Sequence, residues 1–426
     1  MLKHPLARLL RTLPDGTLGT TVALLARVVI QAFTFILISR ELGAGGYGGF
    51  VGVVAISVLV APLSSLGFEF MMLRAIALDQ ASAARAVGTG IAVVAVVGPV
   101  VCLSAWAVCA LMLPGIPWLV ILPVVVADAL LGPFVDVCWR AFQGADMMRR
   151  AATIRVVPAV ARCGAAVICV WQPGTASAAT WAMLYLAGSL SAAVFVMTIT
   201  RARFGTLAVD MSLFRRRLGD SWHFSANVAT ERVTNDADKF LLASLGGATA
   251  AGIYGAAYRI VEIFSVPIAA VVLSANAGAF RAGGIGGIGG VLRRLLIVVG
   301  LYGVMAAAIL HAGAGLVQIL LGPGFAASSH VVAALSLLPL LYGIRSTLWL
   351  ALAATGRHRL RTSAQCVVAV VNVVANIMLI PGLGWVGAVC ATLGSEAILA
   401  GIFAWGLRFS RAPAPPGAPA SGQNAR

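Results

Sequence analysis

Long apolar segments recur along the whole chain, and they constrain its fold more than any other feature. Each is near or above the roughly 20 residues with which a helix crosses a hydrocarbon core about 30 Å thick. About twelve such segments are expected, at 18–38, 47–66, 86–113, 117–139, 154–171, 180–199, 221–245, 251–273, 295–314, 331–352, 364–380 and 386–407. The runs are long and do not alternate with polar residues, whereas lipid admits only helices or closed barrels. The sequence therefore predicts an all-α polytopic membrane protein.

Composition excludes the water-soluble alternative. Of the 426 residues, 60% are hydrophobic and 10% are charged, and the mean hydropathy is +0.98. A soluble domain carries about 25% charged residues, and this chain lacks the polar surface that two or three soluble domains would need. The first apolar segment is retained as a span, not as a cleaved signal peptide, because no small-residue cleavage site follows it.

The formal net charge of +16 comes from basic residues that gather in alternate loops. They lie around 3–11, 74–85, 140–155, 201–217, 281–294, 357–361 and after 408, whereas the intervening loops hold essentially only Arg40. The positive-inside rule places such loops in the cytoplasm. We therefore expect a multi-pass membrane protein with an even number of spans, both termini cytoplasmic, and no nucleic-acid partner.

Six cations lie inside the predicted spans, where each would cost about 2.5–3.5 kcal/mol if it faced lipid. They must line a wet cavity or pair with acids, and we take them as candidate substrate-binding residues: Arg27, Arg162, Arg232, Lys239, Arg259 and Arg345. Some acids within the spans are candidates for binding a coupling proton or sodium ion: Asp128, Glu231, Asp238 and Glu396.

Helical spacing offers local partners to some of these charges. Asp136 and Arg140 are four residues apart, as are Arg232 and Asp236, and Arg259 and Glu262 are three apart, which favours structural pairs. Three of the six cations, Arg27, Arg162 and Arg345, have no local acid. They are the better candidates for binding an anion, although pairing between helices would neutralise any of them.

Two segments combine polar side chains with a membrane span. Gln31 and Thr34 continue the stripe begun by Arg27, at intervals of four and three residues. Segment 221–245 is the most polar of the twelve, and Asn235 lies on the face that neighbours Arg232. We expect both segments to line a cavity. The alternative for 221–245 is that its first half is an amphipathic entry segment in the cytosol.

The chain divides into two similar halves at a basic segment. Residues 40–50 (RELGAGGYGGF) and 245–258 (LGGATAAGIYGAAY) both form a short glycine-rich turn after a span that contains a cation. The predicted organisation is a cytoplasmic segment 1–17, a six-helix bundle 18–200, a linker 201–219, a second six-helix bundle 220–408 and a Pro/Ala/Gly-rich tail 409–426. Repeats that both enter from the cytoplasm are related by an axis along the membrane normal, and substrate is expected in the cleft between such halves.

Several motifs resemble the polysaccharide transporter, or Wzx-type, flippases of the multidrug/oligosaccharidyl-lipid/polysaccharide superfamily. They are 40–50, SLGF at 65–68 followed by Arg74, 238–242 followed by GIYGAAYR at 252–259, and ILLGPGFA at 319–326. The resemblance implies a V-shaped pair of pseudo-symmetric six-helix bundles that moves an undecaprenyl-diphosphate-linked oligosaccharide from the inner to the outer leaflet by alternating access. It also implies that Arg27, Arg232 and Arg259 occupy helices comparable to those that carry cavity cations in this superfamily.

The physical chemistry of the spans agrees with such a substrate, since a diphosphate needs cationic partners in a low-dielectric cavity. Two other functions are kept open. A cation-coupled drug exporter of the same superfamily would have a cavity of acids and aromatics, and a glycan polymerase or ligase would need a long outer loop. The sequence favours a transporter that is not an enzyme, without a cofactor or a metal, working beside glycosyltransferases and a polymerase in the lipid membrane.

Overall fold

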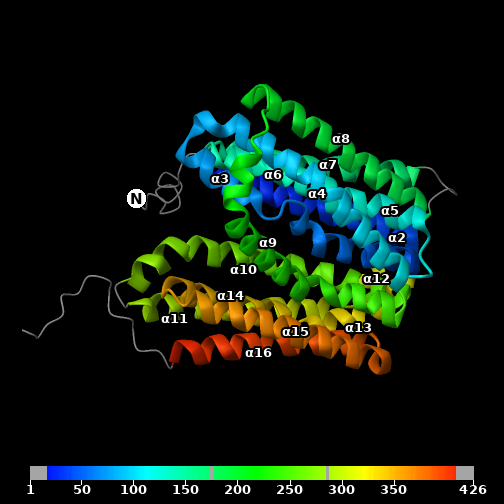
Figure 1. Ribbon diagram of the computed structural model, residues 1–426. Coiled ribbons are helices and arrows are strands. Elements are labelled where there is room, and N and C mark those ends of the chain that lie inside the picture. The colour runs from blue at the N-terminus through cyan, green and yellow to red at the C-terminus, as the bar shows by residue number, and fades with distance from the viewer. Residues whose placement is uncertain (1–16, 172–176, 285–286, 409–426) are drawn as a thin grey trace, which may run out of the picture. The chain divides into compact units, whose positions relative to one another are not determined.

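The computed structural model describes residues 17–171, 177–284 and 287–408, and within these residues every regular element is helical (Figure 1). The first half contains α2 (Thr17–Ser64), α3 (Phe68–Leu78), η1 (Gln80–Ser82), α4 (Ala83–Met112), α5 (Trp118–Val125), η2 (Val126–Leu131), α6 (Gly132–Gly144), α7 (Met148–Trp171) and α8 (Ala178–Phe204). The second half contains α9 (Met211–Leu241), η3 (Leu242–Gly246), α10 (Ala248–Gly284), α11 (Ile288–Gly313), α12 (Leu316–Leu321), η4 (Pro323–Phe325), α13 (Ala326–Leu335), α14 (Leu338–Ala354), α15 (His358–Leu383) and α16 (Trp385–Arg408).

Helix α2 is two membrane crossings joined by a tight turn. Its 48 residues would extend about 72 Å as one straight helix, more than twice the thickness of a hydrocarbon core. Gly43 interrupts the helix with φ 64° and ψ 177°. The rings of Phe35 and Tyr47 lie 5.6 Å apart, although a straight helix would separate these residues by about 18 Å along its axis. The chain therefore folds back at the glycine-rich turn, and the first two predicted spans are confirmed.

The number of helices that could cross a membrane can be compared with the twelve spans predicted from the sequence. In the described part of the chain, nine helices are long and apolar enough to span a membrane, with α2 counted once. A pair bent by 43°, Pro323–Leu335 with Leu338–Ala354, has the composition of a broken span or a re-entrant loop, and it brings the number to ten if it is one span. With α2 counted as two arms, these helices approach the twelve spans that the sequence predicts; the polar helix α9, which is not apolar enough to be counted among them, corresponds to the predicted seventh span. The fold is that of an all-α polytopic membrane protein.

The chain divides into two compact units, and the boundary between them in the sequence differs from the linker that we predict at 201–219. Unit 1 comprises Met1–Ala256 and Gln318–Ala326, and unit 2 comprises Ala257–Val317 and Ala327–Arg426. Helix α9 and the start of α10 belong to unit 1 because small residues let them approach α2 closely. A Cβ added to Gly48 would lie 1.7 Å from the Ala248 carbonyl oxygen. Such small-residue crossings are a common way for membrane helices to associate. The division into bundles 18–200 and 220–408 stays a prediction.

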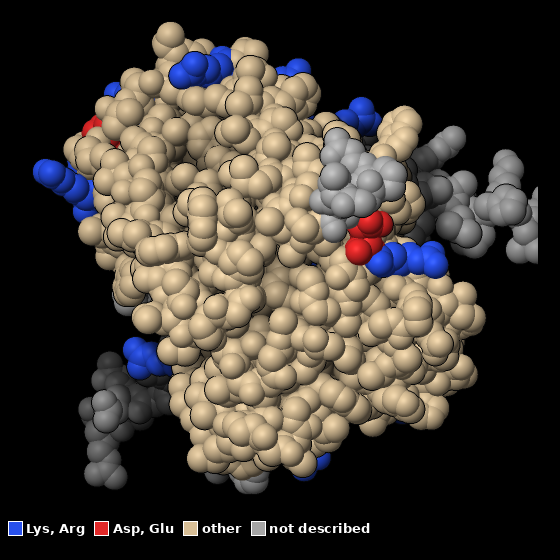
Figure 2. Space-filling view, turned by 90° about the vertical axis from the view of Figure 1, so that its right-hand side faces the viewer, with Lys and Arg blue, Asp and Glu red and all other residues tan. Residues whose placement is uncertain are grey.

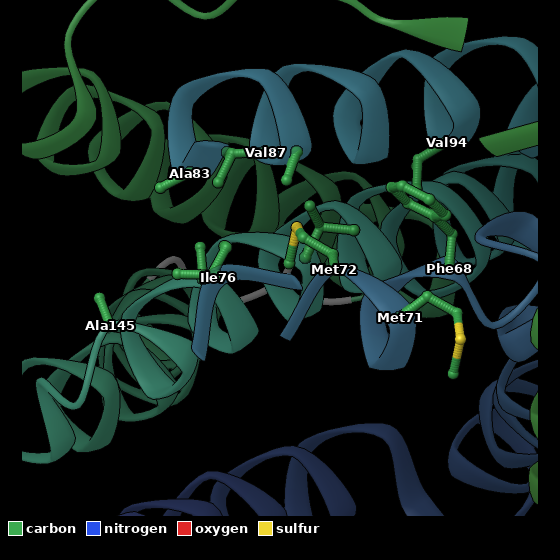
Figure 3. Close-up of a cluster of buried hydrophobic side chains, with 11 residues drawn as sticks. Phe68, Met71, Met72, Ile76, Ala83, Val87, Val94 and Ala145 are labelled. Carbon is green, nitrogen blue, oxygen red and sulfur yellow. The ribbon is translucent and has the colours of Figure 1, made fainter. Parts of the chain in front are cut away.

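The SLGF motif turns the chain from α2 into α3. Gly67 has φ 71°, and a Cβ there would lie 2.2 Å from the backbone oxygen of Ser221 in α9. Glycine is therefore required by both the backbone conformation and the close approach. Phe68 and Met72 then enter a core shared by α3, α4 and α6, together with Ile76 and Val87 (Figure 3).

Surface composition matches a membrane protein. Large apolar side chains are exposed on several helices, with Leu111 at 76%, Leu301 at 71% and Met378 at 74%. Lipid, which solvates apolar groups, accounts for such exposure. Figure 2 views the end at which α4 passes to α5 and α7 to α8, and few charged side chains appear on it. This scarcity agrees with the alternation of basic loops along the sequence.

Candidate functional site

The Arg162 side chain, on α7, is held inside unit 1 by partners from two other elements, η2 and α8. Its Nη2 lies 2.8 Å from Asp128 Oδ1, and its Nε donates to Ser189 Oγ at 2.9 Å. The Tyr185 hydroxyl donates to both Asp128 oxygens at 2.9 and 3.1 Å, and the guanidinium lies 4.1 Å from the centre of the Tyr185 ring. Asp128 is buried on the π-helical turn Val126–Leu131. The pairing between helices that the sequence left open is formed here.

Unit 2 contains a similar arrangement around Arg345. Its Nε donates to Glu396 Oε2 at 2.6 Å, joining α14 to α16, and its guanidinium lies 5.1 Å from the centre of the Tyr342 ring. The side chains of Arg345 and Glu396 are 12% and 8% exposed. In each unit, then, an arginine without a local acid is neutralised by a carboxylate from another element. Two of our better candidates for anion binding are therefore already paired.

Lys239 is enclosed by acids from its own helix. Its Nζ lies 3.1 Å from Asp236 Oδ1 and 3.4 Å from Asp238 Oδ1, and it donates to the backbone oxygen of Asn235. Asp238 is 1% exposed and accepts a hydrogen bond from the hydroxyl of Tyr254 in α10. These contacts fix the end of α9 against the start of α10.

Two of the local pairs expected from helical spacing are not ion pairs in the structure. Arg232 forms no ion pair with Asp236, because that carboxylate turns to Lys239. Arg140 forms none with Asp136, because its guanidinium lies over the Phe70 ring and donates to Gln143 Oε1 at 3.1 Å. Those two predictions are wrong. The third is confirmed, since Arg259 Nη1 lies 3.1 Å from Glu262 Oε2 with both side chains exposed.

The remaining candidates on α2 and α9 are accessible. Arg27 and Gln31 are half-buried, and the Thr34 hydroxyl donates to the Ile30 carbonyl oxygen at 2.8 Å within its own helix. On α9, Glu231 and Arg232 are exposed and Asn235 is half-buried. Arg232 precedes the end of α9 at Leu241 by nine residues, which is about 14 Å of helix, and the predicted span 221–245 would place it near the middle of a core about 30 Å thick.

Of the four candidate coupling acids, three are buried and hydrogen-bonded, and Glu231 is exposed. Sequence reasoning missed a fifth acid, Glu69, because it follows the predicted second span and was treated as a loop residue. Glu69 Oε2 is buried without a hydrogen-bond partner. Burial raises the pKa of this carboxyl, and the neighbouring Asp136 charge raises it further, while Ser65 and Arg140 lower it.

Sequence reasoning also missed a polar contact between α15 and α16. Asn372 Nδ2 donates to Ser395 Oγ at 2.6 Å, and Asn376 Nδ2 donates to Asn372 Oδ1 at 3.1 Å. Polar side chains often join membrane helices in this way. In the described residues no group of three or more His, Cys, Asp or Glu side chains could hold a metal ion.

Residues 13–276, more than half of the chain, match the family model described as "Polysaccharide biosynthesis protein". The chain belongs to the polysaccharide biosynthesis protein family. This result confirms the family resemblance drawn from the motifs at 40–50, 65–68 and 252–259. No curated protein matches this family member in sequence.

Solved structures extend the similarity to nearly the whole length of this polysaccharide biosynthesis protein. An inward-facing multidrug resistance MATE family transporter of the MOP superfamily is 16% identical with a TM-score of 0.71, over 91% of this chain and 97% of that one. The lipid II flippase MurJ in an inward closed conformation is 11% identical with a TM-score of 0.70, over 92% and 88%. A MOP superfamily transporter from Pyrococcus furiosus is 14% identical with a TM-score of 0.63, over 92% and 94%. The family member therefore has the MOP superfamily fold.

Proposed function

We propose that this protein is a flippase that moves a lipid-diphosphate-linked oligosaccharide, a precursor of surface polysaccharide, from the inner to the outer leaflet by alternating access. Membership of the polysaccharide biosynthesis protein family supports the class of substrate. The fold shared with the lipid II flippase MurJ supports the kind of movement, since that relative is named for flipping a lipid. The proposed place of action is the bacterial inner membrane, with both termini cytoplasmic and with glycosyltransferases and a polymerase as partners.

The observation that carries the proposal is the exposure of Arg232, a residue that the predicted span 221–245 places near the middle of the membrane. It forms no ion pair within the described residues, whereas Arg162, Lys239 and Arg345 are neutralised by buried acids. An arginine that faced hydrocarbon there would cost about 2.5–3.5 kcal/mol, so a wet surface or an anionic ligand must solvate it. A diphosphate is such a ligand, and arginine can bind it with two parallel N–H donors. We propose that Arg27, which belongs to the same unit, assists it.

Ion coupling is a separate part of the proposal. We propose that a proton or sodium ion binds at Glu231, which is the exposed member of the four candidate acids. Asp128, Asp238 and Glu396 are already hydrogen-bonded to cations or tyrosines, so charging or discharging them would disturb a buried pair. Glycan transport that continues at an unchanged rate after the proton and sodium gradients are both collapsed would refute ion coupling.

Export of surface polysaccharide tests the proposal in cells that depend on this chain. Arg27→Ala and Arg232→Ala are expected to abolish export while the protein still inserts in the membrane at normal levels. Arg408→Ala is the matched control, because Arg408 is exposed at the end of α16 and outside the proposed binding region. Normal surface polysaccharide in the Arg232→Ala strain would overturn the substrate assignment.

A further inference from the structure

Two arginines outside the candidate set share one aromatic ring. Arg140 near the end of α6 and Arg155 in α7 place their guanidinium carbons 4.3 and 4.2 Å from the centre of the Trp139 ring. Arg140 also lies 4.4 Å from the centre of the Phe70 ring in α3. All four side chains are half-buried. The aromatic faces orient both cations through cation–π attraction and leave their N–H edges to other partners.

Neither cation of this pair is neutralised by an ion pair within the part of the chain that the structure describes. Arg140 Nη1 donates to the uncharged Gln143, and Arg140 Nε is buried without a hydrogen-bond partner. Arg140 and Arg155 lie close enough to repel one another. Holding two like charges together at a half-buried surface is unfavourable, and a bound anion would relieve the repulsion.

Two carboxyl groups near Arg140 affect how strongly an anion would bind there. Asp136 is exposed, and Glu69 is half-buried, and both act on Arg140 at a distance without forming an ion pair. Burial raises the pKa of Glu69, which favours its neutral form and reduces the negative charge that would oppose an incoming anion. The two guanidinium groups therefore lie near one exposed acid, Asp136, and one acid whose charged form burial disfavours, Glu69.

We propose that Arg140 and Arg155, which both stack on the Trp139 ring, form a binding site for a phosphate or diphosphate group at the junction of α6 and α7. The inference rests on the proposed function in one respect, since it identifies the site as the place where the substrate's diphosphate is first bound on the cytoplasmic side. The junction belongs to the basic segment 140–155, which the charge pattern assigns to the cytoplasm. The same chemistry would be offered by a phospholipid headgroup.

Binding of inorganic pyrophosphate to the full-length protein in nanodiscs of neutral phosphatidylcholine tests the site. The variant Arg140→Gln/Arg155→Gln should weaken binding by about tenfold or more, the size expected when charge-assisted hydrogen bonds are lost. The control Arg149→Gln/Arg150→Gln removes the same charge from exposed arginines that, among the residues the structure describes, neither stack on a ring nor form an ion pair. It should change the affinity by less than about threefold, as general charge screening would. Equal losses in both variants, or no binding to the unaltered protein, would overturn the proposal.

The variant Trp139→Leu distinguishes a site that needs oriented arginines from a nonspecific cluster of positive charge. It keeps both arginines but removes the ring that orients them, and it should weaken pyrophosphate binding several-fold while the thermal unfolding temperature shows that the protein is folded. Undiminished binding in folded Trp139→Leu protein would count against the stacked geometry.

Competition identifies the source of the anion. Displacement of pyrophosphate by farnesyl diphosphate, with no effect of phosphatidylglycerol in the nanodisc, supports substrate diphosphate as the ligand. Displacement by phosphatidylglycerol alone would overturn the assignment to substrate and leave a lipid-headgroup site. Failure of the two proposals is distinguishable: pyrophosphate binding without flipping would refute the proposed function, and flipping without binding at this pair would refute the site.

Discussion

Arg162 and Arg232 are the same residue type in two membrane helices of unit 1, but their surroundings differ completely. Arg162 is bound by Asp128, Ser189 and the ring of Tyr185. Arg232 is exposed on α9, and the acid one turn away is engaged by Lys239. A buried pair joins helices and carries no net charge to a ligand, whereas an exposed arginine keeps its charge available. The position of a cation within a span therefore does not by itself indicate a binding role.

Removing the carboxylate that pairs with Arg162 is expected to have the largest effect on stability. Asp128→Ala leaves the half-buried guanidinium of Arg162 without its carboxylate and the Tyr185 hydroxyl without its acceptor, and it should lower the free energy of unfolding by about 3 kcal/mol. Titration with SDS in mixed micelles measures this change. The control Asp136→Ala removes an exposed acid that forms no ion pair, and it should change stability by less than about 0.5 kcal/mol. Similar values for the two variants would contradict a structural role for the Arg162 network.

A slightly smaller effect is expected in unit 2. Glu396→Gln keeps the shape of the side chain and a hydrogen-bonding group but removes the charge opposite Arg345, so stability should fall by about 2 kcal/mol. Adding Arg345→Met should restore more than half of the loss, because the double variant buries no unpaired charge. Additive losses in this cycle would show that the two side chains do not act as a pair.

Replacement of the exposed cation should barely affect stability. Arg232→Gln removes no ion pair, so the free energy of unfolding should change by less than about 0.5 kcal/mol. The same titration used for Asp128→Ala provides the comparison. A loss as large as that of Asp128→Ala would mean that Arg232 is structural, and the contrast between the two regions would disappear.

The smallest effect is a pH dependence at Glu69, for which only the sign is expected. Burial raises the pKa of this carboxyl in the folded protein, so the folded state binds its proton more tightly than the unfolded state does. The stability that this contributes is present below the unfolded pKa near 4.5 and is lost as the pH rises toward the raised folded value. Glu69→Gln should therefore be stabilised relative to the unaltered protein at pH 8 but not at pH 4. An unchanged difference between the two pH values would contradict the burial of this group.

The membrane spans could be predicted from the sequence because their signal is local. Apolar length alone gives the two arms of α2, and the charges in alternate loops give an even number of crossings. The spacing rule also gives the Arg259–Glu262 pair, three residues apart on one helix. Each of these features depends on residues close together in the chain.

Partners between helices could not be predicted, because they depend on how each helix is rotated about its axis. Arg162 meets Asp128, 34 residues away, and Arg345 meets Glu396, 51 residues away. The competition for Asp236 is decided by side-chain direction, since Lys239 and Arg232 both lie within one turn of it. Glu69 was missed because its burial comes from packing of α3 against other helices and not from an apolar run.

The rate of flipping in proteoliposomes tests the central claim most directly. Purified protein is reconstituted with a fluorescent polyprenyl-diphosphate oligosaccharide, and the fraction that reaches the opposite leaflet is measured over time. The account predicts that the unaltered protein and Arg408→Gln flip this lipid at similar rates, while folded Arg232→Gln flips it at least about tenfold more slowly, the equivalent of about 1.4 kcal/mol. Flipping by Arg232→Gln at the unaltered rate would contradict the claim that the exposed arginine of α9 binds the diphosphate.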